Sequence, residues 1–99
     1  VYFRIRRNPD TNVGIDVALA TPEQAAATGK KASFVDGPPA LAAEVLSPND
    51  KLKAIKEAID EYLETGVRVV WIVDPYDDTV TVYRPGAEPV LFNRDQELI

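Results

Sequence analysis

Residues 39–50 read PALAAEVLSPND, and this stretch decides the fold. Apolar residues flank Glu44 on both sides, a run that is typical of a strand buried on both faces. Burying an unpaired carboxylate costs several kcal/mol, so such an acid is normally protonated, paired or bound to a cation. The run stops at the Ser-Pro pair of residues 47–48, a typical helix start. We therefore expect a strand that carries one acid and leads directly into a helix.

The composition restricts the class of protein. With 99 residues, 45% hydrophobic and 27% charged, the chain has the size and composition of one ordinary globular domain. No apolar run approaches the roughly 18 residues of a membrane span, and no leader sequence indicates secretion, so we expect a cytoplasmic location and no membrane partner. The chain contains no Cys and no His. A bound metal must therefore use carboxylate and carbonyl oxygens, which favours Mg²⁺, Mn²⁺ or Ca²⁺.

The net charge of −5 argues against a general nucleic-acid coat protein. The charge is uneven, however, because five of the eleven basic residues lie in the first 34 positions: Arg4, Arg6, Arg7, Lys30 and Lys31. These residues either form a local basic face or are ordinary solvated surface charges, and the sequence leaves both interpretations open.

The elements before the opening stretch have the patterns of strands and one short helix. Residues 1–6 alternate as a strand does, and residues 13–20 (VGIDVALA) form a second apolar run with Asp16 in its interior. Thr21 can cap a short helix. Residues 29–36 are expected to form a surface loop.

The clearest helix follows, with Ser47 as its N-cap and Asp50 as an acid that favours the helix dipole. Its apolar positions recur at three- and four-residue spacing: Leu52, Ile55, Ile59, Tyr62 and Leu63. Gly66 supplies the stop. Strands are expected at residues 67–73, 79–83 and 90–92. This order predicts a mixed α/β sheet with one long helix packed across it.

Two acids, Asp16 and Glu44, lie inside apolar strand runs. If their strands pair as neighbours, both carboxylates can lie on one face and hold a hard cation that stays open to phosphate and water. The alternative is that each acid faces an edge or forms an ion pair. Two acids alone do not decide between these interpretations.

Five segments in a fixed order give the chain a family resemblance. They are GIDVA (14–18), PPALAAEVLSPND (38–50), YLETGV (62–67), VVWIVDP (69–75) and TVTVYRP (79–85). Over about residues 9–86 this combination resembles the Uma-type family of putative restriction endonucleases, within the PD-(D/E)XK nuclease superfamily. The resemblance implies a single restriction-endonuclease-like domain across residues 1–99 that lacks the family's N-terminal helix and strands and its C-terminal end. A start at Val1 and the absence of Met agree with a fragment.

The resemblance also implies a function and a set of metal ligands. Asp16 corresponds to the first metal-binding aspartate, Glu44 to the second metal-binding acid, and the carbonyl of Val45 to a further ligand. With Mg²⁺ or Mn²⁺ held there, the chain is expected to hydrolyse phosphodiester bonds of DNA as an endonuclease. The proline that usually precedes the first aspartate is replaced here by Ile15.

The lysine of the superfamily is the main departure. Its usual position, two residues after the glutamate, is Leu46, and the helix position that the Uma-type family implies is Ala58. On a helical wheel Lys51 points within about 20° of Ala58 but lies roughly 10 Å nearer the helix start. Lys56 points to the opposite flank and Lys53 to solvent. All three lysines can equally be solvated surface residues.

Other aromatic and polar residues are expected to be architectural. Trp71 is expected in the core rather than as a platform for stacked bases, and Asp74 is expected to cap a strand end. Tyr62 is expected to pack under the sheet with its hydroxyl on a polar partner. Ser47 has no evident base that could activate it as a nucleophile.

Three functional interpretations follow. The first is a metal-dependent DNA endonuclease. The second, motivated by Ala58 and the net acidity, is a catalytically impaired relative that acts as a binding or assembly module. The third is a small α/β domain that forms a homo-oligomer through exposed edge strands.

Overall fold

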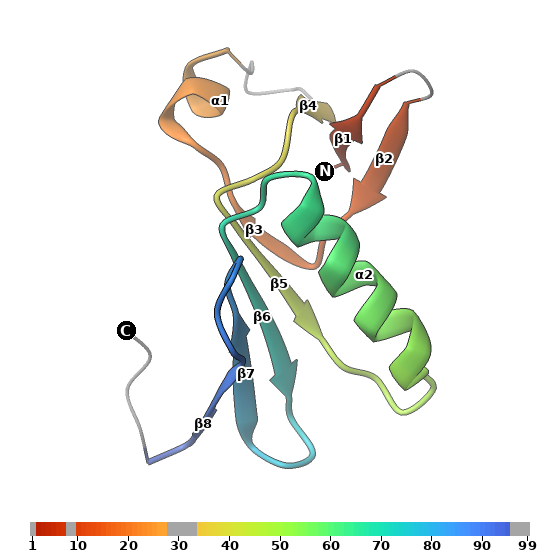
Figure 1. Cartoon of the computed structure of the whole chain (residues 1–99), viewed down its shortest axis with the longest axis vertical. Coiled ribbons are helices and arrows are strands. Elements are labelled where there is room, and N and C mark those ends of the chain that lie inside the picture. Colours follow the sequence, from red (N-terminus) through yellow and green to blue (C-terminus); the bar gives the residue numbers. More distant parts are fainter. Residues whose placement is uncertain (1, 8–9, 28–33, 96–99) are drawn as a thin grey trace.

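The computed structural model describes residues 2–7, 10–27 and 34–95. These residues contain two β-sheets, one long helix and one short helix (Figure 1). The large sheet has the strand order β3-β5-β6-β7-β8, and the small sheet has the order β2-β1-β4. None of the helices in these ranges is long and apolar enough to cross a membrane. In chain order the elements are β1 (Tyr2–Arg6), β2 (Thr11–Gly14), β3 (Val17–Leu19), α1 (Pro22–Ala27), β4 (Phe34–Asp36), β5 (Leu41–Val45), α2 (Leu52–Glu64), β6 (Val69–Asp74), β7 (Thr79–Tyr83) and β8 (Val90–Asn93).

The large sheet confirms the predicted mixed α/β fold. Strands β5 and β6 run parallel, because the α2 crossover between them returns the chain to the same end of the sheet. Strand β3 pairs antiparallel with β5, and β6, β7 and β8 are antiparallel neighbours. Helix α2 packs across one face, where Ala42, Val70 and Ile72 of the sheet are buried in one apolar core with Ile59 and Tyr62 of the helix.

The small sheet extends this core beyond the large one. Strand β1 pairs antiparallel with β2 and parallel with β4, and its buried residues Phe3 and Ile5 join the core around α2. In Figure 1 the small sheet lies beside the C-terminal end of α2, where Arg6 forms ion pairs with Glu61 (3.2 Å) and Glu64 (3.5 Å). The small sheet therefore holds the far end of the helix in place.

Two expectations about the N-terminal region are wrong. The predicted loop at residues 29–36 contains strand β4 at its end, and its first five residues lie outside the described part of the chain. The predicted single strand at residues 13–20 is two strands, since Gly14 ends β2 and Val17 begins β3. The break follows from the pairing, because β2 bonds to β1 in the small sheet and β3 bonds to β5 in the large one.

The long helix begins later than the sequence predicts. Helix α2 starts at Leu52, and the residue before it, Lys51, has an extended backbone (φ −96°, ψ 134°). The Ser47 N–H donates to the Asp50 carboxylate (2.8 Å), and the Asp50 N–H donates to the Ser47 carbonyl (3.1 Å). These bonds close a separate turn between β5 and α2. Ser47 and Asp50, which were expected at the start of the helix, therefore bond to each other in a turn that precedes it.

The apolar stripe of α2 is buried mainly in its C-terminal half. Ile59 and Tyr62 are buried, whereas Leu52 is 84% exposed. The first turns of the helix have a pocket on either flank, and between the two pockets Ile55 packs against the core. Gly66, whose φ of +110° favours glycine, follows the end of the helix as predicted.

The face of the large sheet opposite α2 is apolar and partly exposed. Four of its residues, Val17, Leu19, Val45 and Val90, are 58%, 62%, 44% and 47% exposed. None of the residues on this face joins the core around α2. Trp71, expected in the core, is therefore half-buried on the opposite face. The strand register places on this face Val17, Leu19, Leu41, Ala43, Val45, Val69, Trp71, Val73, Val80, Val82, Val90 and Phe92.

Substitution of one valine on each face tests which face forms the core. Val70 has 0% of its surface exposed, whereas Val17 on the opposite face is 58% exposed. We expect Val70→Ala to lower the free energy of unfolding by about 2–3 kcal/mol, because it removes buried methyl groups and leaves a cavity. Val17→Ala is expected to change it by at most about 0.5 kcal/mol. Urea unfolding followed by circular dichroism measures both, and equal losses would contradict this assignment of the core.

Candidate functional site

A bend at Asp16 brings the first acid to the central strand. Asp16 lies between β2 and β3, directly before Val17, which pairs with Ala43 of β5. The Val45 N–H donates to the Asp16 carboxylate at 2.9 Å. The Val45 N–H thus bonds to the side chain of Asp16 rather than to a backbone carbonyl, and the β3–β5 ladder ends at Val17. The expected position of Asp16 inside a strand is wrong, but the strand that follows it does pair with the strand that carries Glu44.

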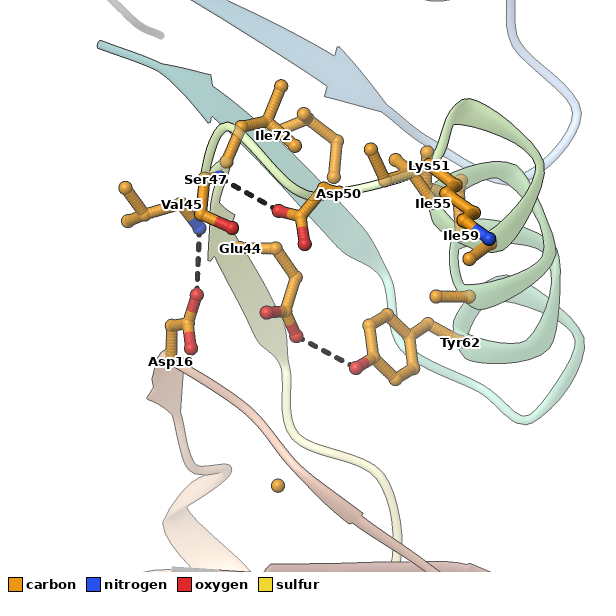
Figure 2. A pocket seen from close by; sticks show the side chains of 14 residues that line it. Asp16, Glu44, Val45, Ser47, Asp50, Lys51, Ile55, Ile59, Tyr62 and Ile72 are labelled. Carbon is orange, nitrogen blue, oxygen red and sulfur yellow. Dashed lines mark hydrogen bonds between the residues drawn. The ribbon is translucent and has the colours of Figure 1, made fainter.

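Glu44 reaches the same place from β5. It pairs in register with Ile72 of β6, and its half-buried side chain points to the α2 side of the sheet. The hydroxyl of Tyr62 donates to the Oε1 atom of Glu44 at 2.8 Å. Figure 2 shows the Glu44 carboxylate between Asp16 on one side and the Tyr62 ring on the other. Tyr62 therefore has the polar partner that was expected for its hydroxyl. The sequence pattern did not identify this partner as Glu44.

The surroundings raise the pKa of Glu44 above its ordinary value. Partial burial is the main cause, and the negative charge of Asp16 acts in the same direction, while the hydrogen bond from Tyr62 opposes both. The pKa of the Tyr62 hydroxyl is also raised, by burial first and then by its bond to the Glu44 carboxylate. Tyr62 thus remains a protonated donor, and the two acids repel each other unless a proton or a cation lies near them.

Asp16 and Glu44 line one open pocket of about 480 Å³ between the central strand and the first turns of α2 (Figure 2). The described residues contain no group of three or more acidic side chains placed to hold a metal ion. A cation bound by the two acids would take its remaining ligands from backbone carbonyls, water or substrate, as Mg²⁺ commonly does. The pair fits such an ion in charge and donor chemistry. The roles of Asp16, Glu44 and the Val45 carbonyl as its ligands stay predictions.

The structure separates the three candidate lysines. Ala58 lines the acidic pocket, so no cation stands at the helix position that the resemblance implies. Lys51 lines this pocket as well. Lys56 lines a different groove, of about 580 Å³, on the opposite flank of α2, and Lys53 lines neither. The expected flank of Lys56 is confirmed, and Lys51 is the candidate that shares a pocket with both acids.

The N-terminal arginines are engaged in ion pairs. Arg4 and Arg7 both pair with Asp36, with a distance of 3.0 Å for Arg4, and Arg6 pairs with acids of α2. The hydrogen bond from Arg4 is the main reason that the pKa of Asp36 lies below its ordinary value. The lysines at residues 30–31 lie outside the described part of the chain. The charges of these three arginines are therefore paired with acids of the chain, and the arginines do not form an unpaired basic face.

Asp74 has the expected structural role at the end of β6. Its Oδ1 atom accepts the backbone N–H groups of Tyr76 (2.9 Å) and Asp77 (3.2 Å), which closes the turn into β7. Asp16 also accepts a backbone N–H, but Asp74 does not line the acidic pocket. Asp74 therefore provides a matched control for Asp16.

Comparison with known proteins gives a family match and a similar solved structure. The sequence model of the Uma2 family, described as "Putative restriction endonuclease", matches residues 2–99. A crystal structure of a putative nuclease belonging to DUF820, from Anabaena variabilis ATCC 29413, has a TM-score of 0.76 and is 24% identical to this chain. The match covers 92% of this chain and 52% of that protein, so this chain spans about half of its length. No curated protein sequence matches the chain.

The raised pKa of Glu44 predicts how stability changes with pH in the absence of metal. Because its pKa is higher in the folded protein than in the unfolded chain, Glu44 favours folding below its unfolded pKa of about 4.3 and loses that contribution as the pH rises through its folded pKa. A glutamine at this position keeps an acceptor for the Tyr62 hydroxyl but carries no charge. We expect Glu44→Gln to raise the melting temperature by roughly 2–4 °C at pH 8, and the gain to shrink towards pH 4.5.

Differential scanning calorimetry in EDTA at pH 4.5, 6 and 8 measures this difference. Glu57→Gln, at an exposed position of α2, is the control and should show no pH-dependent gain. A melting temperature for Glu44→Gln below that of the wild type at pH 8 would contradict the raised pKa.

Proposed function

This chain belongs to the Uma2 family of putative restriction endonucleases, and we propose that it forms the acidic pocket of a metal-dependent endonuclease that hydrolyses DNA. The observation that supports the proposal is the convergence of Asp16 and Glu44, from opposite sides of the β3–β5 junction, on one pocket. Two carboxylates at an open pocket suit a hard cation and a phosphodiester better than any uncharged substrate.

Asp16 and Glu44 would hold Mg²⁺ or Mn²⁺, with the Val45 carbonyl as a further ligand. When bound, the ion lowers the pKa of a coordinated water and neutralises charge on the phosphate. The chain's own residues orient the ligands. The Val45 N–H fixes one oxygen of Asp16, and the Tyr62 hydroxyl fixes one oxygen of Glu44, which leaves the other oxygen of each carboxylate available.

The electrostatics of the pocket favour this function. Burial, and then the negative charge of Asp16, raise the pKa of Glu44, so the charged form of Glu44 is disfavoured in this pocket. A divalent cation removes this repulsion and also offsets the repulsion between the acidic chain, with a net charge of −5, and the DNA backbone. We therefore expect DNA binding to depend on the divalent ion.

Two isosteric variants separate the charge of the acids from their structural bonds. An asparagine at position 16 can still accept the Val45 N–H, and a glutamine at position 44 can still accept the Tyr62 hydroxyl. We expect Asp16→Asn and Glu44→Gln each to lower the rate of plasmid cleavage in Mg²⁺ or Mn²⁺ by about 100-fold or more, because several kcal/mol of charge stabilisation depend on the ion. Isothermal titration calorimetry with Mn²⁺ should show a matching loss of metal affinity.

Asp74→Asn is the control, because it changes a carboxylate that also accepts backbone N–H groups but lies outside the pocket. It should cleave and bind Mn²⁺ as the wild type does. Equal cleavage by the wild type and both pocket variants would contradict the proposed site.

A second candidate function, an assembly module without catalysis, is favoured by two observations. Ala58 stands in the pocket where the resemblance implies a lysine, and the sheet face opposite α2 is apolar and partly exposed. In this alternative the partner is a second copy of the chain. The exposed and half-buried residues of the face make a patch on the order of 500 Å² per copy, or about 1,000 Å² for the pair, which is near the lower limit of a specific interface.

Light scattering tests the alternative, which predicts a dimer in solution. Leu19→Lys should then shift the protein to a monomer, because it places a charge on the apolar face at a position that is 62% exposed. Leu91→Lys, on the α2 side of β8 and 57% exposed, is the matched control and should remain dimeric. A monomer at all concentrations up to about 1 mM would exclude this alternative.

A further inference from the structure

The acidic pocket has one basic residue on its wall. Three acids line it, Asp16, Glu44 and Asp50, and Lys51 is the only Lys or Arg among the described residues that line it. A phosphodiester entering this pocket meets the carboxylates of Asp16 and Glu44 on the sheet side. A cation on the opposite side would attract the phosphate and counter the charge that develops on it.

The turn before α2 positions the backbone of Lys51. Lys51 follows Asp50, whose carboxylate is held by the Ser47 N–H at 2.8 Å, and its extended backbone (φ −96°) precedes the first residue of the helix. Figure 2 shows Lys51 on the α2 side of the pocket, with Asp16 and Glu44 on the sheet side. A helical wheel does not predict the direction of the Lys51 side chain, because Lys51 is the N-cap of α2 and its backbone is extended rather than helical.

The ammonium of Lys51 is available to a ligand. The ion pairs between described residues engage Arg4, Arg6, Arg7 and Arg94, and none of them includes Lys51, whose side chain is exposed. The pocket wall beyond Lys51 carries the small side chains of Ala54 and Ala58. These leave room for a phosphate group beside the helix, and a lysine on its flexible four-carbon stem can follow the phosphate as it moves.

We infer that Lys51 contacts the phosphate of the substrate and serves in place of the lysine that is absent at Ala58. This inference rests on the proposed function, since it assigns a residue to the same pocket. In the cleavage step Lys51 neither gains nor loses a proton. It donates hydrogen bonds to a non-bridging phosphate oxygen, whose negative charge grows in the transition state.

The first test measures binding without cleavage, with a short fluorescent DNA duplex and Ca²⁺ in place of Mg²⁺. One lost phosphate contact reduces the slope of log K against log salt by about 0.9. We expect this reduction for Lys51→Ala but not for Lys53→Ala, which removes the same charge two residues away and outside the pocket. Lys51→Arg should keep the wild-type slope. Unchanged melting temperatures show that the variants are folded.

The second test measures cleavage of plasmid DNA in Mg²⁺. Lys51→Ala should lower kcat/KM by about 10²–10³-fold, the loss expected when one donor to a developing oxyanion is removed. Ala58→Lys in the Lys51→Ala background should recover part of this loss, because it returns an ammonium to the same pocket. Lys53→Ala should cleave as the wild type does.

The outcomes separate this inference from the proposed function. Cleavage by the wild type together with an unaffected Lys51→Ala would overturn the role of Lys51 and leave the endonuclease intact. If Lys51→Ala is the one variant with a smaller slope of log K against log salt, and neither the wild type nor any variant cleaves DNA, the phosphate contact is supported and the endonuclease is not. Absence of DNA binding by the wild type in Ca²⁺ would overturn both.

Discussion

One hydrogen bond, from the Val45 N–H to the Asp16 carboxylate, holds the chain at the point where the two sheets and the pocket meet. It lies where the β3–β5 ladder ends and the chain passes from the small sheet to the large one. Because the acceptor is a side chain, the backbone is free to bend there, and Asp16 is held at the rim of the pocket rather than inside a strand. The same carboxylate therefore serves the architecture and the proposed metal site.

The second constraint is electrostatic and joins the sheet to the helix. Glu44 is half-buried and lies near Asp16, so burial and repulsion disfavour its charged form. The hydrogen bond from the Tyr62 hydroxyl of α2 offsets this only in part. Other acids have different partners: Asp36 forms ion pairs with arginines, and Asp74 accepts backbone N–H groups. The raised pKa of Glu44 supports the proposed cation site at Asp16 and Glu44.

The two faces of the large sheet have different roles. The face under α2 carries the core and the acidic pocket, whereas the opposite face is apolar and partly exposed. Parallel strands such as β5 and β6 are normally covered on both faces. Further protein packed on the exposed face would therefore stabilise the chain by hydrophobic burial, without occupying the pocket.

The sequence by itself determined the central and C-terminal strands, the existence of the long helix, the turn at Asp74, the stop at Gly66 and the two candidate acids, because these depend on patterns within a few residues. It did not determine strand β4, the break between β2 and β3, or the first residue of α2. Only the tertiary structure decided which groups meet. Asp16 and the Val45 N–H are 29 residues apart, and Tyr62 and Glu44 are 18 apart, so local pattern carries no signal of either bond. The place of Lys51 was decided in the same way: its residue type suits a helix, but the turn closed by Asp50 keeps it out of the helix and on the wall of the pocket.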